Sequence, residues 1–187
     1  MLLYTTGLRL GELVQLTLGD YDSHERTLLI RDSKFHKSRL MPLSIDGTRE
    51  IDQCLAVRRS RQIGISPESP LLWHYTRRGS AYTGTGLTNA IRPLLRALQI
   101  RTETGRLPRI HDFRHTFALE ALLRWYRSGA DVQAKLPLLA TYMGHVSIAS
   151  TEYYLKFVEA LGVSASERFA RHCSGVLAMP ASTGGVR

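Results

Sequence analysis

The sequence predicts an α+β fold that is mainly α-helical and contains one small antiparallel β-sheet. Apolar residues recur at helical spacing in several segments, most regularly over residues 110–127. Two short runs rich in β-forming residues, 27–31 and 39–43, flank a polar stretch, and this arrangement is typical of a β-hairpin. The chain has 187 residues, of which 43% are hydrophobic, so it can form one domain with a substantial core.

The N-terminal half of the chain is expected to hold the sheet between helices. The expected elements are, in chain order, a helix end at 2–7, a helix at 10–18, strands at 27–31 and 39–43 around a hairpin loop at 32–38, and an Arg-rich amphipathic helix at 46–62. Gly7 can close the first helix because glycine readily adopts the left-handed backbone of a C-cap. Pro42 lacks a backbone N–H and is expected to end the second strand.

The C-terminal half is expected to be mostly helical. The expected elements are loops at 64–70 and 79–86, a strand or buried turn at 71–75, a break at 102–108, and helices at 87–98, 110–127, 137–143, 150–161 and 164–177. Gly144 and Gly162 would stop two of these helices. Ser164 and Glu167 have the spacing of a capping box for the last one. Residues 178–187 are rich in Ala, Ser, Thr and Gly and are expected to be a disordered tail.

Positive charge dominates the chain and is concentrated in its middle third. The net charge is +9, and residues 53–102 carry eight arginines and a single glutamate, a net charge of +7. Arginine grips phosphate through two parallel hydrogen bonds, so the pattern favours a polyanionic partner, with a solvated basic face as the alternative. No apolar run reaches the roughly 18 residues that a membrane span needs. Two cysteines cannot form a disulfide scaffold, and a reduced, cytoplasmic protein is expected.

Two polar segments in the N-terminal half are candidates for chemistry. Arg9 begins an apolar helix and Glu12 follows three residues later, so the carboxylate can brace the guanidinium. The alternative is an ordinary surface pair. Lys34 and its neighbours up to Arg39 form a cationic hairpin tip that suits a phosphate backbone, although a charged turn would look the same.

The segment that begins the helix at 110–127 carries two histidines and an arginine. His111, Arg114 and His115 share one face of that helix. The spacing of the two histidines matches the pair that binds zinc in some peptidases. Here Asp112 replaces the glutamate of that motif, and Arg114 would place a cation beside the metal. A metal site is therefore disfavoured, and the simple alternative is an exposed pair of histidines.

The last candidate segment joins two of the expected helices. Gly144 and His145 form a turn, and Tyr154 follows nine residues later in the next helix. Tyr154 could equally be a core aromatic residue, and Tyr153 competes with it for any special role.

The order Arg…Lys…His-x-x-Arg…Gly-His…Tyr resembles the tyrosine recombinase (phage integrase) family. The resemblance runs from Tyr4 to about Val158. It implies the catalytic-domain fold of that family over residues 1–177, with the N-terminal core-binding domain absent. It assigns catalytic roles to Arg9, Lys34, His111, Arg114, His145 and Tyr154, with Glu12 in a supporting role.

The resemblance implies that the chain cleaves and rejoins DNA strands through a 3′-phosphotyrosyl intermediate, in site-specific recombination, integration or transposition of a mobile element. Tyr154 would attack the phosphorus while Arg9 and Arg114 stabilise the charge of the transition state. His111 would take the phenol proton, and Lys34 would protonate the leaving 5′-oxygen. No metal or other cofactor is expected, because cationic side chains would replace it.

The implied partner is double-stranded DNA, bound by a homo-oligomer that forms a tetrameric synapse in the nucleoid. Further phosphate contacts are expected from Lys37, Arg39, Arg77, Arg78, Arg92 and Arg96. Residues 164–177 are expected to be exchanged between protomers. The alternatives are a truncated DNA-binding fragment that occupies recombination sites without recombining them, a type IB topoisomerase, and a zinc hydrolase.

Overall fold

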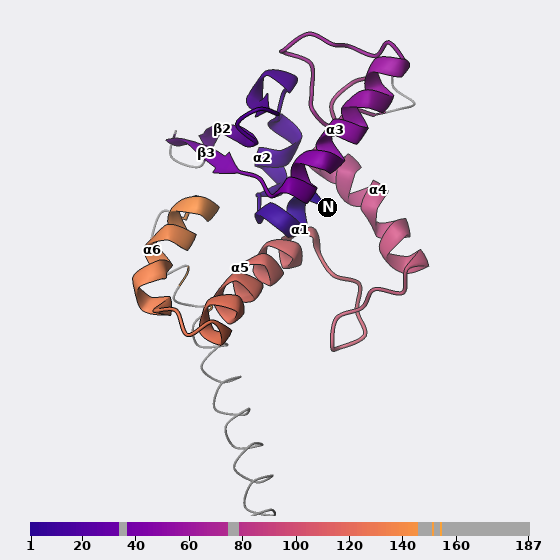
Figure 1. The fold of residues 1–187 in the computed structure, drawn as a ribbon. Helices are drawn as coiled ribbons and strands as arrows, with labels where there is room; N and C mark the ends of the chain where they lie inside the picture. The colour runs from indigo at the N-terminus through magenta and orange to yellow at the C-terminus, as the bar shows by residue number, and fades with distance from the viewer. Residues whose placement is uncertain (34–36, 75–78, 146–150, 152–153, 155–187) are drawn as a thin grey trace, which may run out of the picture.

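The structure is a computed structural model, and it describes residues 1–33, 37–74, 79–145, 151 and 154. The described chain is mainly helical with one three-stranded antiparallel sheet, which confirms the predicted fold class (Figure 1). Its elements are α1 (Leu2–Thr6), α2 (Leu10–Gln15), the 3₁₀ helix η1 (Leu18–Asp20), β1 (Tyr21–Asp22), β2 (Thr27–Ser33), β3 (Lys37–Pro42), α3 (Ile45–Ser60), α4 (Gly84–Ala97), α5 (Ile110–Arg127) and α6 (Val132–Met143).

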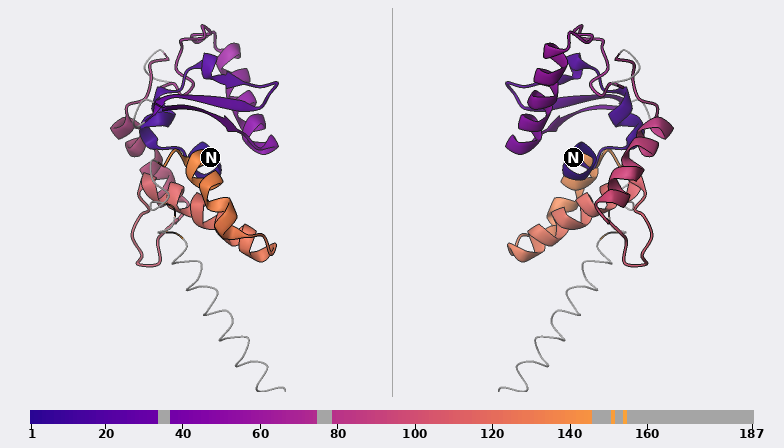
Figure 2. Two further views of the ribbon diagram at one scale, coloured as in Figure 1. Left: turned by 90° about the vertical axis from the view of Figure 1, so that its left-hand side faces the viewer. Right: turned by 90° about the vertical axis from the view of Figure 1, so that its right-hand side faces the viewer.

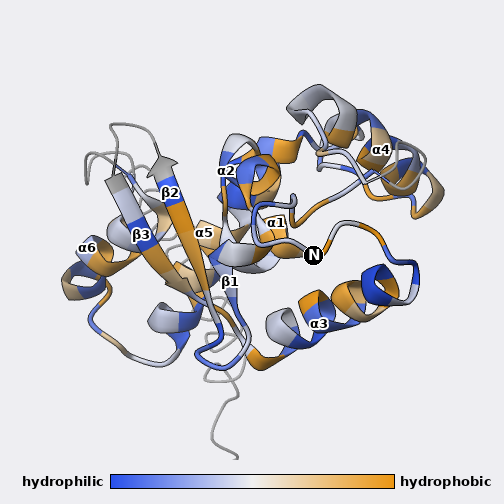
Figure 3. Ribbon diagram, turned by 90° about the horizontal axis from the view of Figure 1, so that it is seen from above, coloured by the Kyte–Doolittle hydropathy of each residue, from blue (hydrophilic) through white to orange (hydrophobic). Residues whose placement is uncertain are grey.

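The sheet has the order β1-β2-β3, with β2 in the centre. Leu28 pairs with Met41, and Ile30 pairs with Arg39. Leu28, Ile30 and Met41 are all buried, whereas Leu40 on β3 is 68% exposed, so alternate residues face the core and the solvent. Figure 3 shows the hydrophobic residues of β2 as a run along the strand. One face of the sheet therefore packs inward, as expected for an antiparallel sheet.

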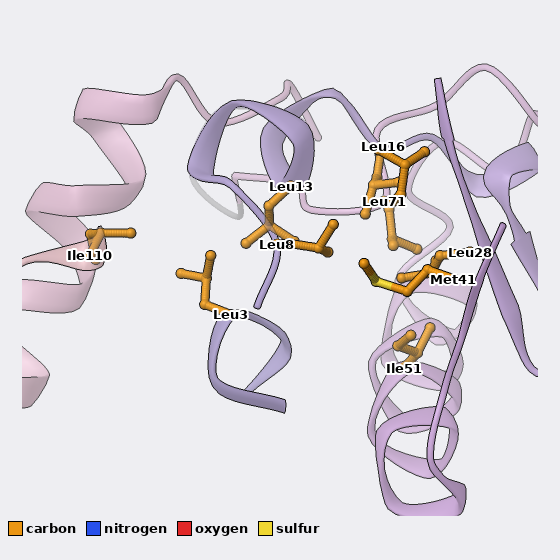
Figure 4. Packing of buried hydrophobic residues seen from close by; sticks show 10 residues of the cluster. Leu3, Leu8, Leu13, Leu16, Leu28, Met41, Ile51, Leu71 and Ile110 are labelled. Atoms are coloured by element: carbon orange, nitrogen blue, oxygen red, sulfur yellow. The ribbon is translucent and has the colours of Figure 1, made fainter. Parts of the chain in front are cut away.

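Two groups of buried side chains hold the fold together. The first joins α1, α2, the sheet and α3, with Leu8, Met41 and Ile51 among its members (Figure 4). The second joins α5 and α6 around Leu122 and Met143. The views in Figure 2 show the sheet and α3 on one side of the molecule, α5 and α6 on the other, and α1 between them. The candidate site lies where these two parts meet.

Gly7 ends α1, as the sequence predicts, and it also permits the packing of α1 on α5. Its φ of 63° places it in the left-handed region. A Cβ atom at Gly7 would lie 2.5 Å from Cδ1 of Phe117 on α5. A side chain here would therefore strain the backbone and push the two helices apart.

The expected bounds of two helices were wrong. α6 begins at Val132 rather than 137, because Asp131 caps it by accepting a hydrogen bond from the backbone N–H of Ala134. Pro137 is accommodated inside the helix. α4 begins at Gly84 rather than 87, because Thr83 caps it in the same way. The expected start was too late in both helices. Glycines at the start of α4 were assigned to a loop, and Pro137 inside α6 was taken as the start of that helix.

The expected helix at 10–18 was also too long. α2 ends at Gln15, and Asp20 then accepts hydrogen bonds from the backbone and side chain of Thr17, which stabilises η1. β1 has only two residues and was not predicted. The two hairpin strands extend further into the polar loop than expected. The pairing of β2 with β3 shifts in register between Ile30 and Ser33 and then resumes, with Ser33 opposite Lys37.

Several expectations concern residues outside the described part of the chain. The helices at 150–161 and 164–177 and the tail at 178–187 lie there, apart from Thr151 and Tyr154, which are both helical. The hairpin tip at 34–36 also lies there. Among the described residues, no helix is long and apolar enough to cross a membrane.

Candidate active site

The start of α2, the first half of α5, the end of α6 and β3 bring their polar side chains together. These elements come from distant parts of the sequence, and three hydrogen bonds of the site join residues more than 100 positions apart. Six of the sequence-predicted residues lie together here, namely Arg9, Glu12, Arg39, Arg114, His145 and Tyr154.

Arg9 is the N-cap residue of α2 and forms the predicted pair with Glu12. Its Nη1 donates to Oε1 of Glu12 at 2.8 Å, and its backbone N–H donates to Oε2 at 3.0 Å. Its Nη2 donates to the carbonyl oxygen of Gly144 at 2.6 Å. The guanidinium of Arg9 is thus fixed between the start of α2 and the end of α6.

Arg39 approaches the same carboxylate from β3. Its Nη1 and Nη2 donate to the two oxygens of Glu12 at 3.1 and 3.0 Å, in a bidentate pair. Its Nε donates to the carbonyl oxygen of Tyr142 at 2.9 Å, and only 11% of its side chain is exposed. The sequence predicts a phosphate contact for Arg39, but the structure places this guanidinium inside the framework of the site.

Glu12 is a buried carboxylate between two guanidiniums. Burial acts to raise its pKa, but the hydrogen bonds and charge of Arg39 and Arg9 outweigh that effect and hold the pKa below its ordinary value. Glu12 therefore stays ionised at neutral pH and positions both arginines.

Arg114 is the most deeply buried cation of the site, with 3% of its surface exposed. Its Nη1 donates to the carbonyl oxygen of Gly7, and its Nη2 donates to that of Met143 at 2.7 Å. Burial, followed by repulsion from Arg9, lowers the pKa of Arg114 to about 10. Arg114 remains a cation at neutral pH, fixed by the ends of α1 and α6.

His145 is partly buried beside the arginines of the site, and both features affect its pKa. Burial, then the charges of Arg114, Arg9 and Arg39, lower the pKa of His145 to about 4. Its Nδ1 lies 2.8 Å from Oγ1 of Thr151. At neutral pH His145 is therefore an uncharged hydrogen-bonding group in a field that favours anions.

Gly144 permits the close approach of the arginines to the end of α6. Its φ is 66°, in the left-handed region. A Cβ atom at this position would lie 2.6 Å from Nη1 of Arg39 and 3.2 Å from Nη1 of Arg9. The Gly-His turn predicted from the sequence thus has a steric reason.

Tyr154 is buried, with 4% of its surface exposed, and packs in the cluster between α5 and α6. Its hydroxyl lies 2.8 Å from Nδ1 of His115. Its ring stacks against that of His145, with a centroid distance of 6.4 Å and an angle of 8°. It also acts electrostatically on Arg114. Tyr154 is therefore a core aromatic residue whose hydroxyl belongs to the site.

The two histidines of α5 occupy different environments. His111 is exposed, and its ring meets the edge of the His115 ring at a centroid distance of 4.6 Å. His115 is partly buried and contacts the Tyr154 hydroxyl. The family resemblance assigns the proton of that hydroxyl to His111 and gives His115 no role. The missed signal was that His115 lies one helical turn deeper along α5, toward the packed core.

The other predicted residues lie elsewhere. Lys34, Arg77 and Arg78 fall outside the described residues, and Lys37 begins β3. Arg92 and Arg96 are exposed on α4, on the opposite side of the molecule from α6 (Figure 1). Within the described part of the chain, no three His, Cys, Asp or Glu residues gather in a group that could hold a metal ion.

Known proteins resemble this chain over most of its length. The model of the phage integrase family matches residues 1–159. The integrase/recombinase y4rB of Sinorhizobium fredii is 36% identical over 171 residues, which cover 91% of this chain and 54% of that protein. Tyrosine recombinase XerD of Mycobacterium tuberculosis is 31% identical, over 82% of this chain and 45% of its own. The chain thus spans about half the length of these relatives.

Solved structures share its fold. The XerA recombinase superposes with a TM-score of 0.66 and 25% identity, over 82% of this chain and 49% of its own. The XerH recombinase in a post-cleavage complex with its difH substrate superposes with a TM-score of 0.67 and 24% identity, over 88% of this chain and 43% of its own.

Proposed function

The chain belongs to the phage integrase family, and we propose that it is the catalytic part of a tyrosine recombinase that cleaves and rejoins DNA strands in site-specific recombination. The observation that carries the proposal is the single cluster formed by Arg9, Arg114, His145 and the Tyr154 hydroxyl. This cluster combines a nucleophile with fixed cations and few carboxylates. Such a combination suits attack on a phosphodiester.

The arginines keep hydrogen-bonding capacity for a phosphate. A guanidinium has five N–H donors. Arg9 and Arg114 each use one N–H of Nη1 and one of Nη2 in the contacts described above. The remaining donors can stabilise the non-bridging oxygens as negative charge develops in the pentacoordinate transition state. Because the framework holds both guanidiniums in advance, little reorganisation accompanies the reaction.

In the proposed reaction, the Tyr154 oxygen attacks the phosphorus and forms a 3′-phosphotyrosyl bond, while the bond to the 5′-oxygen breaks. We assign the proton for that leaving oxygen to Lys34 at the hairpin tip. One phosphodiester replaces another, so a 5′-hydroxyl of a second strand can reverse the step without ATP. Neutral His145 and His111 would donate hydrogen bonds to the phosphate. Cationic side chains stabilise the charge, so the step as proposed needs no metal ion.

The proposed substrate is double-stranded DNA in the cytoplasm, bound by an oligomer that forms a tetrameric synapse. We assign the catalytic domain to residues 1–177. Outside the site, phosphate contacts are proposed for Lys37, Arg77, Arg78, Arg92 and Arg96 along the basic middle of the chain.

A second candidate function is a DNA-binding fragment that occupies recombination sites without catalysis. The observation that favours it is the burial of the proposed nucleophile, since only 4% of the surface of Tyr154 is exposed. A fragment of this kind would bind DNA but form no covalent bond to it, so covalent chemistry separates the two functions.

The test uses nicked suicide duplexes, in which the cleaved 5′-fragment diffuses away and the covalent product accumulates. A pool with a randomised core avoids the need to know the site. Incubation in EDTA should yield protein–DNA adducts in the wild type and in Tyr153→Phe, but none in Tyr154→Phe. Binding without any adduct would favour the fragment, and adducts that require a metal ion would refute the metal-independent step.

A further inference from the structure

Resting on the proposed function, we propose that His115 is the general base of strand cleavage and removes the proton from the Tyr154 hydroxyl. The two atoms, Nδ1 of His115 and Oη of Tyr154, are 2.8 Å apart. This distance lies within the range that proton transfer requires. His111, the histidine expected from the sequence, is exposed and contacts the ring of His115.

The burial of Tyr154 makes a protein base necessary. Its side chain is packed among Leu122, Leu136 and Met143, and 4% of its surface is exposed. A phenol has a pKa of about 10, so it is almost wholly protonated at neutral pH. Bulk water has little access to its proton, and His115 lies directly on the oxygen that must lose it.

The surroundings of His115 keep it in the form that accepts a proton. The charged or titratable groups that act on it are His111, Asp112 and Arg114 of α5 and Arg109 at the N-cap of that helix, and Tyr154 contacts it from the following segment. Burial, then the charges of His111 and of the two arginines, lower the pKa of His115, whereas Asp112 acts in the opposite direction. Its imidazole is therefore neutral at pH 7. With the hydrogen on Nε2, Nδ1 is free to accept the phenol proton.

Each bond that forms in the proposed step is matched by a bond that breaks. The O–H bond of Tyr154 breaks, and its proton moves to Nδ1 of His115. The phenolic oxygen forms its bond to phosphorus, and the bond from phosphorus to the 5′-oxygen breaks. That oxygen leaves with a proton from the general acid. During rejoining, the imidazolium of His115 returns its proton to the phenolic oxygen.

The test measures single-turnover cleavage of suicide substrates with either oxygen or sulfur at the bridging 5′ position. Sulfur leaves without help from an acid, so its cleavage reports on the nucleophile. His115→Asn keeps a hydrogen-bonding amide near the position of Nδ1 but cannot take the proton. We expect a loss of roughly 100-fold or more on both substrates. The cleavage rate of the wild type should fall at acidic pH, where the imidazole of His115 becomes protonated and can no longer accept the phenol proton. His115→Asn should lack this acidic limb of the pH–rate profile.

Three controls define the outcome. His111→Asn should keep the acid limb, and His24→Asn, in an exposed turn, should cleave as the wild type does. Lys34→Ala should lose activity on the oxygen substrate and regain it on sulfur. A His115→Asn rate within about threefold of the wild type on the sulfur substrate, or a loss on the oxygen substrate alone, would overturn the base assignment.

An NMR titration of His115 separates this inference from the proposed function, because it needs no DNA. A hydroxyl that donates to Nδ1 stabilises the neutral imidazole, so Tyr154→Phe should raise the pKa of His115. An unchanged pKa would overturn the inference even if the wild type forms adducts. A raised pKa with no adduct on any duplex would confirm the contact and refute the recombinase function, and the base role with it.

Discussion

Glu12→Gln tests the idea that one carboxylate holds both Arg9 and Arg39 in place. The substitution keeps the shape of the side chain but removes its negative charge and replaces one of the two carboxylate oxygens by an amide nitrogen. Those two oxygens accept hydrogen bonds from both guanidiniums at 2.8–3.1 Å. Removing one partner of a buried ion pair costs about 3–5 kcal/mol. The side chain of Arg9 is 27% exposed, which weakens its share. We expect a loss of about 3 kcal/mol and a fall in Tm of about 6–12 °C.

The pH dependence of this loss gives a second measurement. The pKa of Glu12 is lowered in the folded state, so its stabilisation is complete above its ordinary pKa of 4.5 and is lost as pH falls through the folded pKa. Urea unfolding should therefore show the full difference between wild type and variant at pH 7 and a shrinking difference below pH 4.5. The control is Glu120→Gln, at an exposed position on α5. Equal stability of Glu12→Gln and wild type at pH 7 would refute the reasoning.

The remaining predictions concern the turn, the buried cation and the basic surface. Gly144→Ala should lower the free energy of unfolding by about 1–3 kcal/mol, because its Cβ would lie 2.6 Å from Nη1 of Arg39 and its φ is positive; a variant as stable as the wild type in urea would contradict this. Arg114→Lys should reduce adduct formation by about 100-fold with DNA binding largely kept, because lysine cannot replace a bidentate donor; an unchanged cleavage rate would remove Arg114 from the mechanism. The affinity for DNA should fall steeply between 50 and 200 mM salt, and the double change Arg92→Ala and Arg96→Ala should reduce the slope of log K against log salt by about 2; a slope that does not change would show that α4 makes no phosphate contact.

Local patterns in the sequence were sufficient for part of the site. The spacing of Arg9 and Glu12 predicts their pairing, because three residues at the start of a helix bring the two side chains together. The bounds of α5 matched the expected 110–127 because its apolar spacing is regular and its ends lack ambiguous residues. Gly7 ended α1 as expected because a left-handed C-cap strongly favours glycine.

Contacts between distant segments could not be predicted in this way. The pairing of Arg39 with Glu12 joins residues 27 positions apart and depends on how the sheet packs against α2. The choice between His111 and His115 depends on which of them faces Tyr154, and helical spacing alone allows both. The start of α6 was missed because proline was read as a barrier, although a capped helix accommodates Pro137.

The most direct test of the central claim is to identify the residue that carries the covalent DNA. The adduct formed on a suicide duplex in EDTA is digested with nuclease and protease, and the modified peptide is sequenced by mass spectrometry. Nucleophilic attack from the arginine–histidine cluster predicts a nucleotide attached through phosphate to the oxygen of Tyr154. Attachment to Tyr153 or to any other residue, or the absence of an adduct from a protein that binds the duplex, would contradict it.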